Sequence, residues 1–106
     1  MHDCDRTEII RGTTPTLIFT FSTIDVNNIT TAYLTVKGDV SFEKDIDQAV
    51  KDENTLSWTL TQTETLSLVV NKPVTIYCDW VTIDGTRGRS KQKTAMVAPT
   101  GKEMVI

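Results

Sequence analysis

Hydrophobic and polar residues alternate along most of this chain, which is typical of strands with one buried face. In the segment 16–22, Leu17, Phe19 and Phe21 occupy one set of alternate positions, while Thr16, Ile18, Thr20 and Ser22 occupy the other. Side chains two residues apart lie on the same face of a strand. The alternation therefore predicts a core strand over 16–22, with the phenylalanines directed inward.

The same period of two predicts further strands at 7–11, 29–36, 40–43, 55–60, 74–83 and 86–98. In the strand at 55–60, we expect Leu56, Trp58 and Leu60 to point inward. Gly38-Asp39 predicts a hairpin between the strands at 29–36 and 40–43. Asp84-Gly85 predicts another hairpin with a two-residue type I′ turn, in which both central residues have positive φ.

The segment before the 74–83 strand predicts a short helix. Thr61-Gln62-Thr63-Glu64 has the Thr-x-x-Glu spacing of a capping box, and Asn71-Lys72-Pro73 ends the segment. About seven strands with one helical crossover near residues 62–69 predict an all-β fold, an immunoglobulin-like antiparallel β-sandwich. A closed barrel is the alternative. The length of 106 residues predicts a single domain over 1–106.

The 74–83 strand is apolar on both faces. Ile76, Cys78 and Trp80 share one face, and Tyr77, Val81 and Ile83 share the other. A strand of this kind in an antiparallel sheet needs a cover on its second face. We expect either the helical crossover or another subunit to provide it.

Four basic residues alternate on the returning arm of the last hairpin: Arg87, Arg89, Lys91 and Lys93. On one continuous strand these side chains form a basic stripe on one face. The stripe is a candidate contact for an acidic partner or a phosphate backbone. Lysines at a sheet edge also prevent pairing with other chains, so edge protection is the competing interpretation. Residues 86–98 contain no aromatic residue for base stacking, which favours a protein partner over nucleic acid.

Charge and composition reduce the range of expected partners and cellular locations. The net charge of −3 argues against general nucleic-acid binding. Residues 1–53 carry ten acidic and five basic residues, and residues 54–106 carry four and six, which permits head-to-tail attraction between copies. The sequence contains no apolar run of membrane-spanning length, and Met1-His2-Asp3-Cys4-Asp5-Arg6 lacks the basic and apolar regions typical of a signal peptide. We therefore expect synthesis in the cytoplasm and no membrane contact.

Candidate catalytic chemistry is sparse. His2 is the single histidine, so a catalytic triad or a multi-histidine metal site is not expected. His2, Asp3, Cys4 and Asp5 are ligand types, but adjacent residues on an extended segment do not converge on one ion. We expect no enzyme activity, cofactor, metal or small-molecule substrate. Trp58 and Trp80 follow the inward positions, which favours core packing over sugar binding. Tyr33 and Tyr77 are the candidates for the alternative function, an adhesion or glycan-binding module.

Several segments resemble small structural proteins of tailed bacteriophages that infect Gram-positive hosts. They are Arg11-Gly12-Thr13-Thr14-Pro15-Thr16, Leu60-Thr61-Gln62-Thr63-Glu64-Thr65-Leu66, the aromatic strand that ends at Asp84-Gly85, and Gly101-Lys102-Glu103-Met104-Val105-Ile106. The second half is also similar to the N-terminal β-sandwich domain of phage baseplate upper proteins.

This resemblance implies a non-enzymatic structural component of a virion, in the tail, baseplate, neck or capsid surface. We expect no stalk or receptor-binding domain after the sandwich, unlike in the baseplate proteins, which leaves the position in the particle open. The implied partners are other virion proteins and copies of itself. We expect docking through strand edges and through termini ordered by assembly, with Met104, Val105 and Ile106 able to add a strand to a neighbour's sheet edge.

Overall fold

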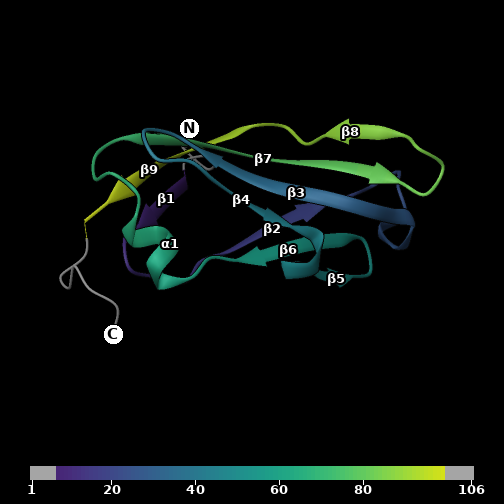
Figure 1. Cartoon of the computed structure of the whole chain (residues 1–106), viewed down its shortest axis with the longest axis horizontal. Coiled ribbons are helices and arrows are strands. Elements are labelled where there is room, and N and C mark those ends of the chain that lie inside the picture. The colour runs from purple at the N-terminus through teal and green to yellow at the C-terminus, as the bar shows by residue number, and fades with distance from the viewer. Residues whose placement is uncertain (1–6, 100–106) are drawn as a thin grey trace, which may run out of the picture.

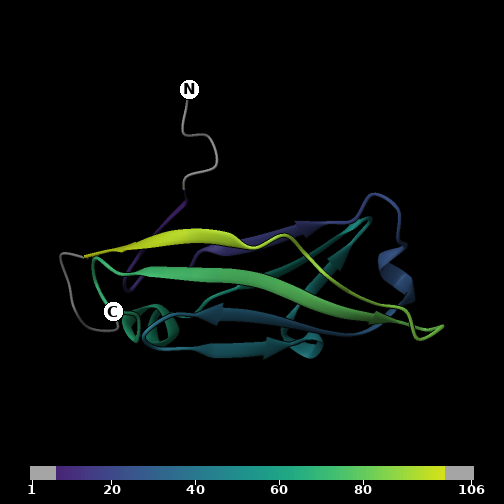
Figure 2. The same cartoon turned by 90° about the horizontal axis from the view of Figure 1, so that it is seen from above.

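Two β-sheets face each other across a hydrophobic core in the computed structural model, which describes residues 7–99 (Figure 1). The larger sheet contains, in spatial order, β1 (Thr7–Ile10), β9 (Lys93–Ala98), β7 (Pro73–Thr82), β3 (Ile29–Lys37) and β4 (Phe42–Asp45), with β8 (Arg87–Arg89) also paired to β7. The smaller sheet contains β2 (Thr16–Thr20), β6 (Thr55–Thr59) and β5 (Val50–Asp52). Figure 2 looks onto the larger sheet, where β9, β7, β3 and β4 lie side by side.

The connections match an immunoglobulin-type sandwich, which confirms the predicted fold. The chain passes from β2 to β3 and β4 in the larger sheet, returns to β5 and β6, and then crosses to β7. This gives one sheet of β2, β6 and β5 and another built on β3, β7 and the last strand, as in that fold. One pairing differs from the prediction, because β1 runs parallel to β9. The sandwich is therefore antiparallel except at this edge.

The predicted inward positions form the core. Leu56, Trp58 and Leu60 are fully buried. The Trp58 ring packs edge-to-face on Phe19, with 5.8 Å between ring centroids, and its Nε1 donates a hydrogen bond of 2.8 Å to the Asp45 carbonyl oxygen. Burying the polar end of a Trp requires such a partner. Trp58 therefore serves the core and is not a sugar platform.

The helical crossover is present as α1 (Gln62–Leu66), and its capping box forms as predicted. Thr61 Oγ1 accepts from the Glu64 amide at 3.1 Å, and Glu64 Oε1 accepts from the Thr61 amide at 2.8 Å. The buried Thr65 Oγ1 accepts from the Gly12 amide and donates to the Thr13 carbonyl oxygen. These two bonds fasten the turn that follows β1 onto the helix.

Short elements without an alternating pattern were not predicted. β5 has three exposed residues and gives no periodic signal. Two 3₁₀-helices, Val26–Asn28 and Ile46–Gln48, begin at the capping residues Asp25 and Asp45. The hairpin at Gly38-Asp39 is confirmed, but its loop extends from Gly38 to Ser41, so the prediction that a strand resumes at Val40 is wrong.

The hairpin at Asp84-Gly85 also forms, but the prediction of a two-residue type I′ turn is wrong. Gly85 has φ of 89°, whereas Asp84 is not among the residues with positive φ. The Gly85 amide donates to the Thr82 carbonyl oxygen and the Thr82 amide to the Thr86 carbonyl oxygen. The loop therefore has three residues and one left-handed glycine, which is another common solution for hairpins.

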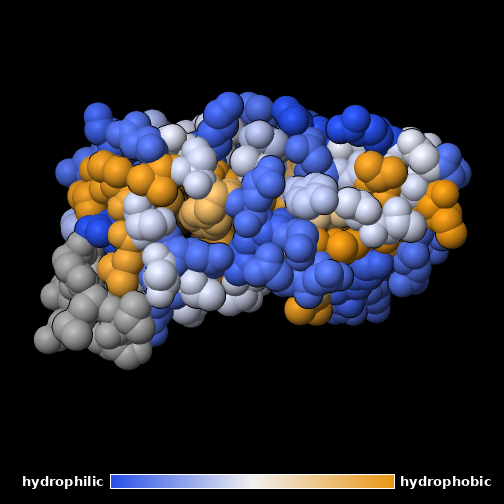
Figure 3. All heavy atoms as spheres, viewed as in Figure 1, coloured by the Kyte–Doolittle hydropathy of each residue, from blue (hydrophilic) through white to orange (hydrophobic). Residues whose placement is uncertain are grey.

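The second face of β7 is not covered by the helical crossover, since α1 lies at one end of the sandwich (Figure 1). Tyr77 and Val81 are half-buried there, and Ile83 at the tip is 74% exposed. Figure 3 shows the molecule from the side, as in Figure 1, and there hydrophilic residues surround several separate apolar patches. A cover from another subunit stays a prediction.

Candidate docking site

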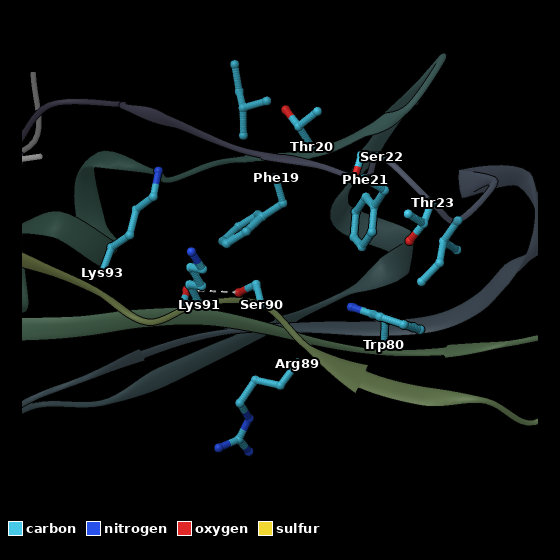
Figure 4. Close-up of a pocket in the computed structure, with 12 residues that line it drawn as sticks. Phe19, Thr20, Phe21, Ser22, Thr23, Trp80, Arg89, Ser90, Lys91 and Lys93 are labelled. Carbon is cyan, nitrogen blue, oxygen red and sulfur yellow. Dashed lines mark hydrogen bonds between the residues drawn. The ribbon is translucent and has the colours of Figure 1, made fainter.

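One lateral side of the sandwich is open. On the opposite side, the chain from β4 through residues 46–49 to β5 crosses from one sheet to the other and closes it. On the open side, β2 and the segment 89–93 border a groove of about 480 Å³. A second hollow of about 270 Å³ continues along β2 and shares Ile18, Phe19 and Lys93 with the first. We call this continuous feature the edge groove (Figure 4).

Aromatic side chains form the apolar part of the edge groove. Phe19 and Phe21 project from β2 and its continuation, and Trp80 projects from β7 (Figure 4). The Phe21 and Trp80 rings meet edge-to-face with 5.9 Å between centroids. Gly88 of β8 lies directly opposite Trp80 in the sheet, and a Cβ at Gly88 would stand 2.1 Å from the Trp80 ring. The ring therefore occupies its place because residue 88 has no side chain.

The backbone of β2 presents unpaired groups along the groove. The Pro15 carbonyl oxygen accepts from the Leu60 amide and the Phe21 amide donates to the Asn54 carbonyl oxygen, so odd-numbered residues direct their backbone groups toward β6. Even-numbered residues point the other way, because backbone groups alternate along a strand. The N–H and C=O groups of Thr16, Ile18 and Thr20 thus face the free edge, which no strand in residues 7–99 covers. Such an edge is a template for an added strand.

The predicted basic stripe is wrong, because the structure divides it between two faces. Arg87 and Arg89 pair with Val81 and Asp79 and lie on the outer face of the larger sheet. Lys93 pairs with the buried Ile76 and lies on the inner face. Figure 4 shows Lys91 and Lys93 beside the groove, while Arg89 points away from it.

A one-residue irregularity at Ser90 causes this division. The pairs of β7 with β8 and with β9 differ in register by one residue, and residues 90–92 belong to neither strand. The Ser90 amide donates to the Cys78 carbonyl oxygen at 2.8 Å, and the Cys78 amide donates to Ser90 Oγ at 2.9 Å in place of a backbone acceptor. A bulge of one residue moves the following side chains to the opposite face. The rule that residues two apart share a face of the strand therefore does not hold across Ser90.

Arg89 is already engaged on the outer face. Its Nε donates to Asp79 Oδ1 at 2.6 Å, and its guanidinium carbon lies 4.4 Å from the centre of the Tyr77 ring. The hydrogen bond to Asp79 raises the pKa of Arg89 further. Because the guanidinium covers Tyr77, that ring is a poor sugar platform, while Tyr33 is exposed on the neighbouring strand. These contacts weigh against the glycan-binding alternative.

Of the predicted site residues, Arg89, Lys91 and Lys93 line the groove, but the Arg89 guanidinium is directed away from it to Asp79. Within residues 7–99, no carboxylate lies within ion-pair distance of the Lys91 or Lys93 ammonium group. Met104, Val105 and Ile106 lie outside the described residues. In the part of the chain that is described, no group of three or more His, Cys, Asp or Glu side chains is placed to hold a metal ion, and no helix has the length and apolar character needed to cross a membrane.

Sequence reasoning missed the free edge of β2 and the aromatic groove beside it. The alternation in 16–22 predicts which side chains point inward, but it does not predict which edge of the strand has no paired neighbour. The pair Gly88 and Ser90 was a usable signal, since glycine within a strand marks a bulge or a close approach.

Comparison with known proteins does not place the chain in a family. No family model matches the sequence, and no curated protein is significantly similar to it.

Proposed function

We propose that this protein is a non-enzymatic structural subunit of a tailed bacteriophage virion. The resemblance of its turn and strand segments to phage structural proteins motivates the virion assignment. The fold supports a structural role, because an immunoglobulin-type sandwich of this size offers stable sheet edges as contact surfaces.

The observation that carries the proposal is the free edge of β2 beside an apolar groove. An extended segment of a neighbouring virion protein adds to β2 by hydrogen bonds with the backbone of Thr16, Ile18 and Thr20. Alternate side chains of that segment enter the groove against Phe19 and Phe21. Backbone pairing supplies affinity, and the aromatic pockets supply register.

The test is the composition of intact particles. Virions are purified by density gradient from a host that carries the encoding phage, and peptides of this chain are quantified against those of a known virion protein. We expect a fixed copy number per particle that persists through a second gradient and a high-salt wash. Absence of the chain from washed particles, with abundant chain in the lysate, overturns the proposal.

A further inference from the structure

The free edge of β2 lacks the features that keep other sheet edges from pairing. Thr16–Thr20 and the continuation to Ser22 contain no charged residue and no proline. Edge strands are usually protected by lysines, prolines or bulges. β2 pairs with β6 without a shift in register, so β2 has no bulge. An added strand therefore meets no charged side chain and no irregularity along β2 itself.

The pairing geometry fixes which residues of an added strand face the edge groove. In an antiparallel arrangement, residues opposite Thr16, Ile18 and Thr20 form the hydrogen-bonded pairs, and their side chains lie on the exposed outer face. Residues opposite Phe19 and Phe21 project inward, to the side on which these two rings line the groove. Successive inward positions are two residues apart. The groove therefore contacts every second residue of its occupant.

The chemical character of the groove changes along β2. At one end, the edge-to-face contact of Phe21 with Trp80 makes the groove apolar (Figure 4). Next to Phe19, the opposite wall carries Lys91 and Lys93, and Figure 4 shows both lysine side chains extending toward the side of β2. Neighbouring inward positions of an added strand thus meet an aromatic surface and a pair of cations.

The two cations favour a polypeptide that brings a carboxylate. Within residues 7–99, neither Lys91 nor Lys93 has a carboxylate at ion-pair distance. A second copy placed edge to edge on β2 does not supply one, because residues 16–22 contain no Asp or Glu. Nucleic acid does not match the edge, since phosphate oxygens only accept hydrogen bonds, whereas the edge presents both N–H and C=O groups.

We propose that the occupant of the edge groove is an extended segment of another protein in which an acidic residue lies between two apolar residues, each two positions away. Opposite Phe19, the carboxylate pairs with Lys91 and Lys93. The apolar residues lie opposite Phe21 and Leu17, which line the groove on either side. The motif is symmetric, so it fits both strand directions. The inference rests on the β2 contact of the proposed function and adds the chemistry of the partner.

Peptide titration of the full chain, followed by NMR, tests the proposal. The probe is a capped peptide, Thr-Val-Thr-Glu-Thr-Val-Thr, which is compared with the same peptide carrying Lys in place of Glu. We expect the amide signals of Thr16, Ile18 and Thr20 to shift on binding. The glutamate peptide should bind at least about fivefold more tightly, because it replaces repulsion by two lysines with attraction.

Charge reversal in the protein should reverse this preference. In Lys91→Glu/Lys93→Glu, the lysine peptide should bind more tightly than the glutamate peptide. Lys37→Glu/Lys72→Glu is the matched control, because it changes the net charge equally at exposed residues that do not line the groove. The control should keep the preference for glutamate. Should the reversed variant not fold, Lys91→Gln/Lys93→Gln replaces it and should bind both peptides equally.

Several results overturn the inference. Equal affinity of the native chain for both peptides, with the β2 amides shifting, overturns the partner chemistry and leaves the β2 contact standing. Binding of neither peptide also overturns it. Shifts of the same amides on dilution without peptide assign the edge to a second copy, and shifts with a single-stranded oligonucleotide assign the groove to nucleic acid. Absence of the chain from washed particles, with the peptide preference intact, overturns the virion proposal alone.

Discussion

Single residues with little side chain set the shape of the open side of the sandwich. Gly88 admits the Trp80 ring, and Ser90 turns the last strand so that Lys93 faces inward. Neither residue stands out by hydrophobicity. Gly88 acts by leaving space for the Trp80 ring of β7, and Ser90 acts by accepting a hydrogen bond from the Cys78 amide of β7.

Replacing Gly88 by Ala should lower the free energy of unfolding by about 1–3 kcal/mol, because the new methyl group overlaps Trp80 and breaks its packing on Phe21. Urea unfolding followed by Trp fluorescence measures the change. Gln92→Ala is the control, since residue 92 is exposed in the same arm of the hairpin. An unchanged midpoint for Gly88→Ala contradicts the packing argument.

Cys78 should resist thiol reagents in the folded protein. Burial, with the nearby Asp79 carboxylate, raises the pKa of its thiol to about 12, so little reactive thiolate forms at pH 8. In a Cys4→Ser background, we expect Ellman's reagent to modify Cys78 only when urea unfolds the chain. Rapid modification of the native protein, at a rate independent of urea, would show that the core strand opens at this point.

At the scale of elements, a partly buried ion pair connects β4 to α1. Lys44 Nζ donates to Glu64 Oε1 at 2.9 Å and to the Thr59 carbonyl oxygen at 3.1 Å, and Lys44 is 5% exposed. Burial raises the pKa of Glu64, but hydrogen bonds from the Thr61 amide and from Lys44 outweigh it, and the net pKa is lowered. The Glu64 carboxylate therefore both caps the helix and compensates the charge of the buried Lys44 ammonium.

This pair predicts a loss of stability in acid. Because the pKa of Glu64 is lower when folded, its contribution is complete above the unfolded value near 4.5 and is lost as the pH falls through the folded value. Glu64→Gln should cost about 1–3 kcal/mol at pH 7, and less at pH 3. Urea titrations at both pH values measure this.

The exposed Glu43 of β4 supplies the matched control for that experiment. Glu43→Gln should have a small effect at either pH. If Glu64→Gln is equally costly at pH 7 and pH 3, the charge of Glu64 is not the source of its contribution.

At the scale of the whole molecule, the sandwich is closed on one side and open along β2. Ile18→Pro removes an amide that points to the free edge and should block strand addition with little effect on the fold, since proline is tolerated on edge strands. We expect incorporation into particles to fall at least about tenfold. The proline removes one backbone hydrogen bond, and its ring obstructs the added strand. Quantitative mass spectrometry of purified virions measures it.

Ile18→Thr separates backbone pairing from side-chain contact, because it keeps the amide and shortens a side chain that is 57% exposed. Because Ile18 also lines the groove, this variant should lose some incorporation, but much less than Ile18→Pro. Normal incorporation of a folded Ile18→Pro variant would exclude the β2 edge as the contact.

The sequence by itself determined the all-β class, the inward faces of the main strands and the capped helix. These features depend on interactions between residues two to four apart, so periodicity and capping motifs carry them. Only the tertiary structure decided the parallel pairing of β1, the free edge of β2 and the division of the four basic residues. These features depend on which strands become neighbours and on a one-residue bulge, and a local pattern contains neither.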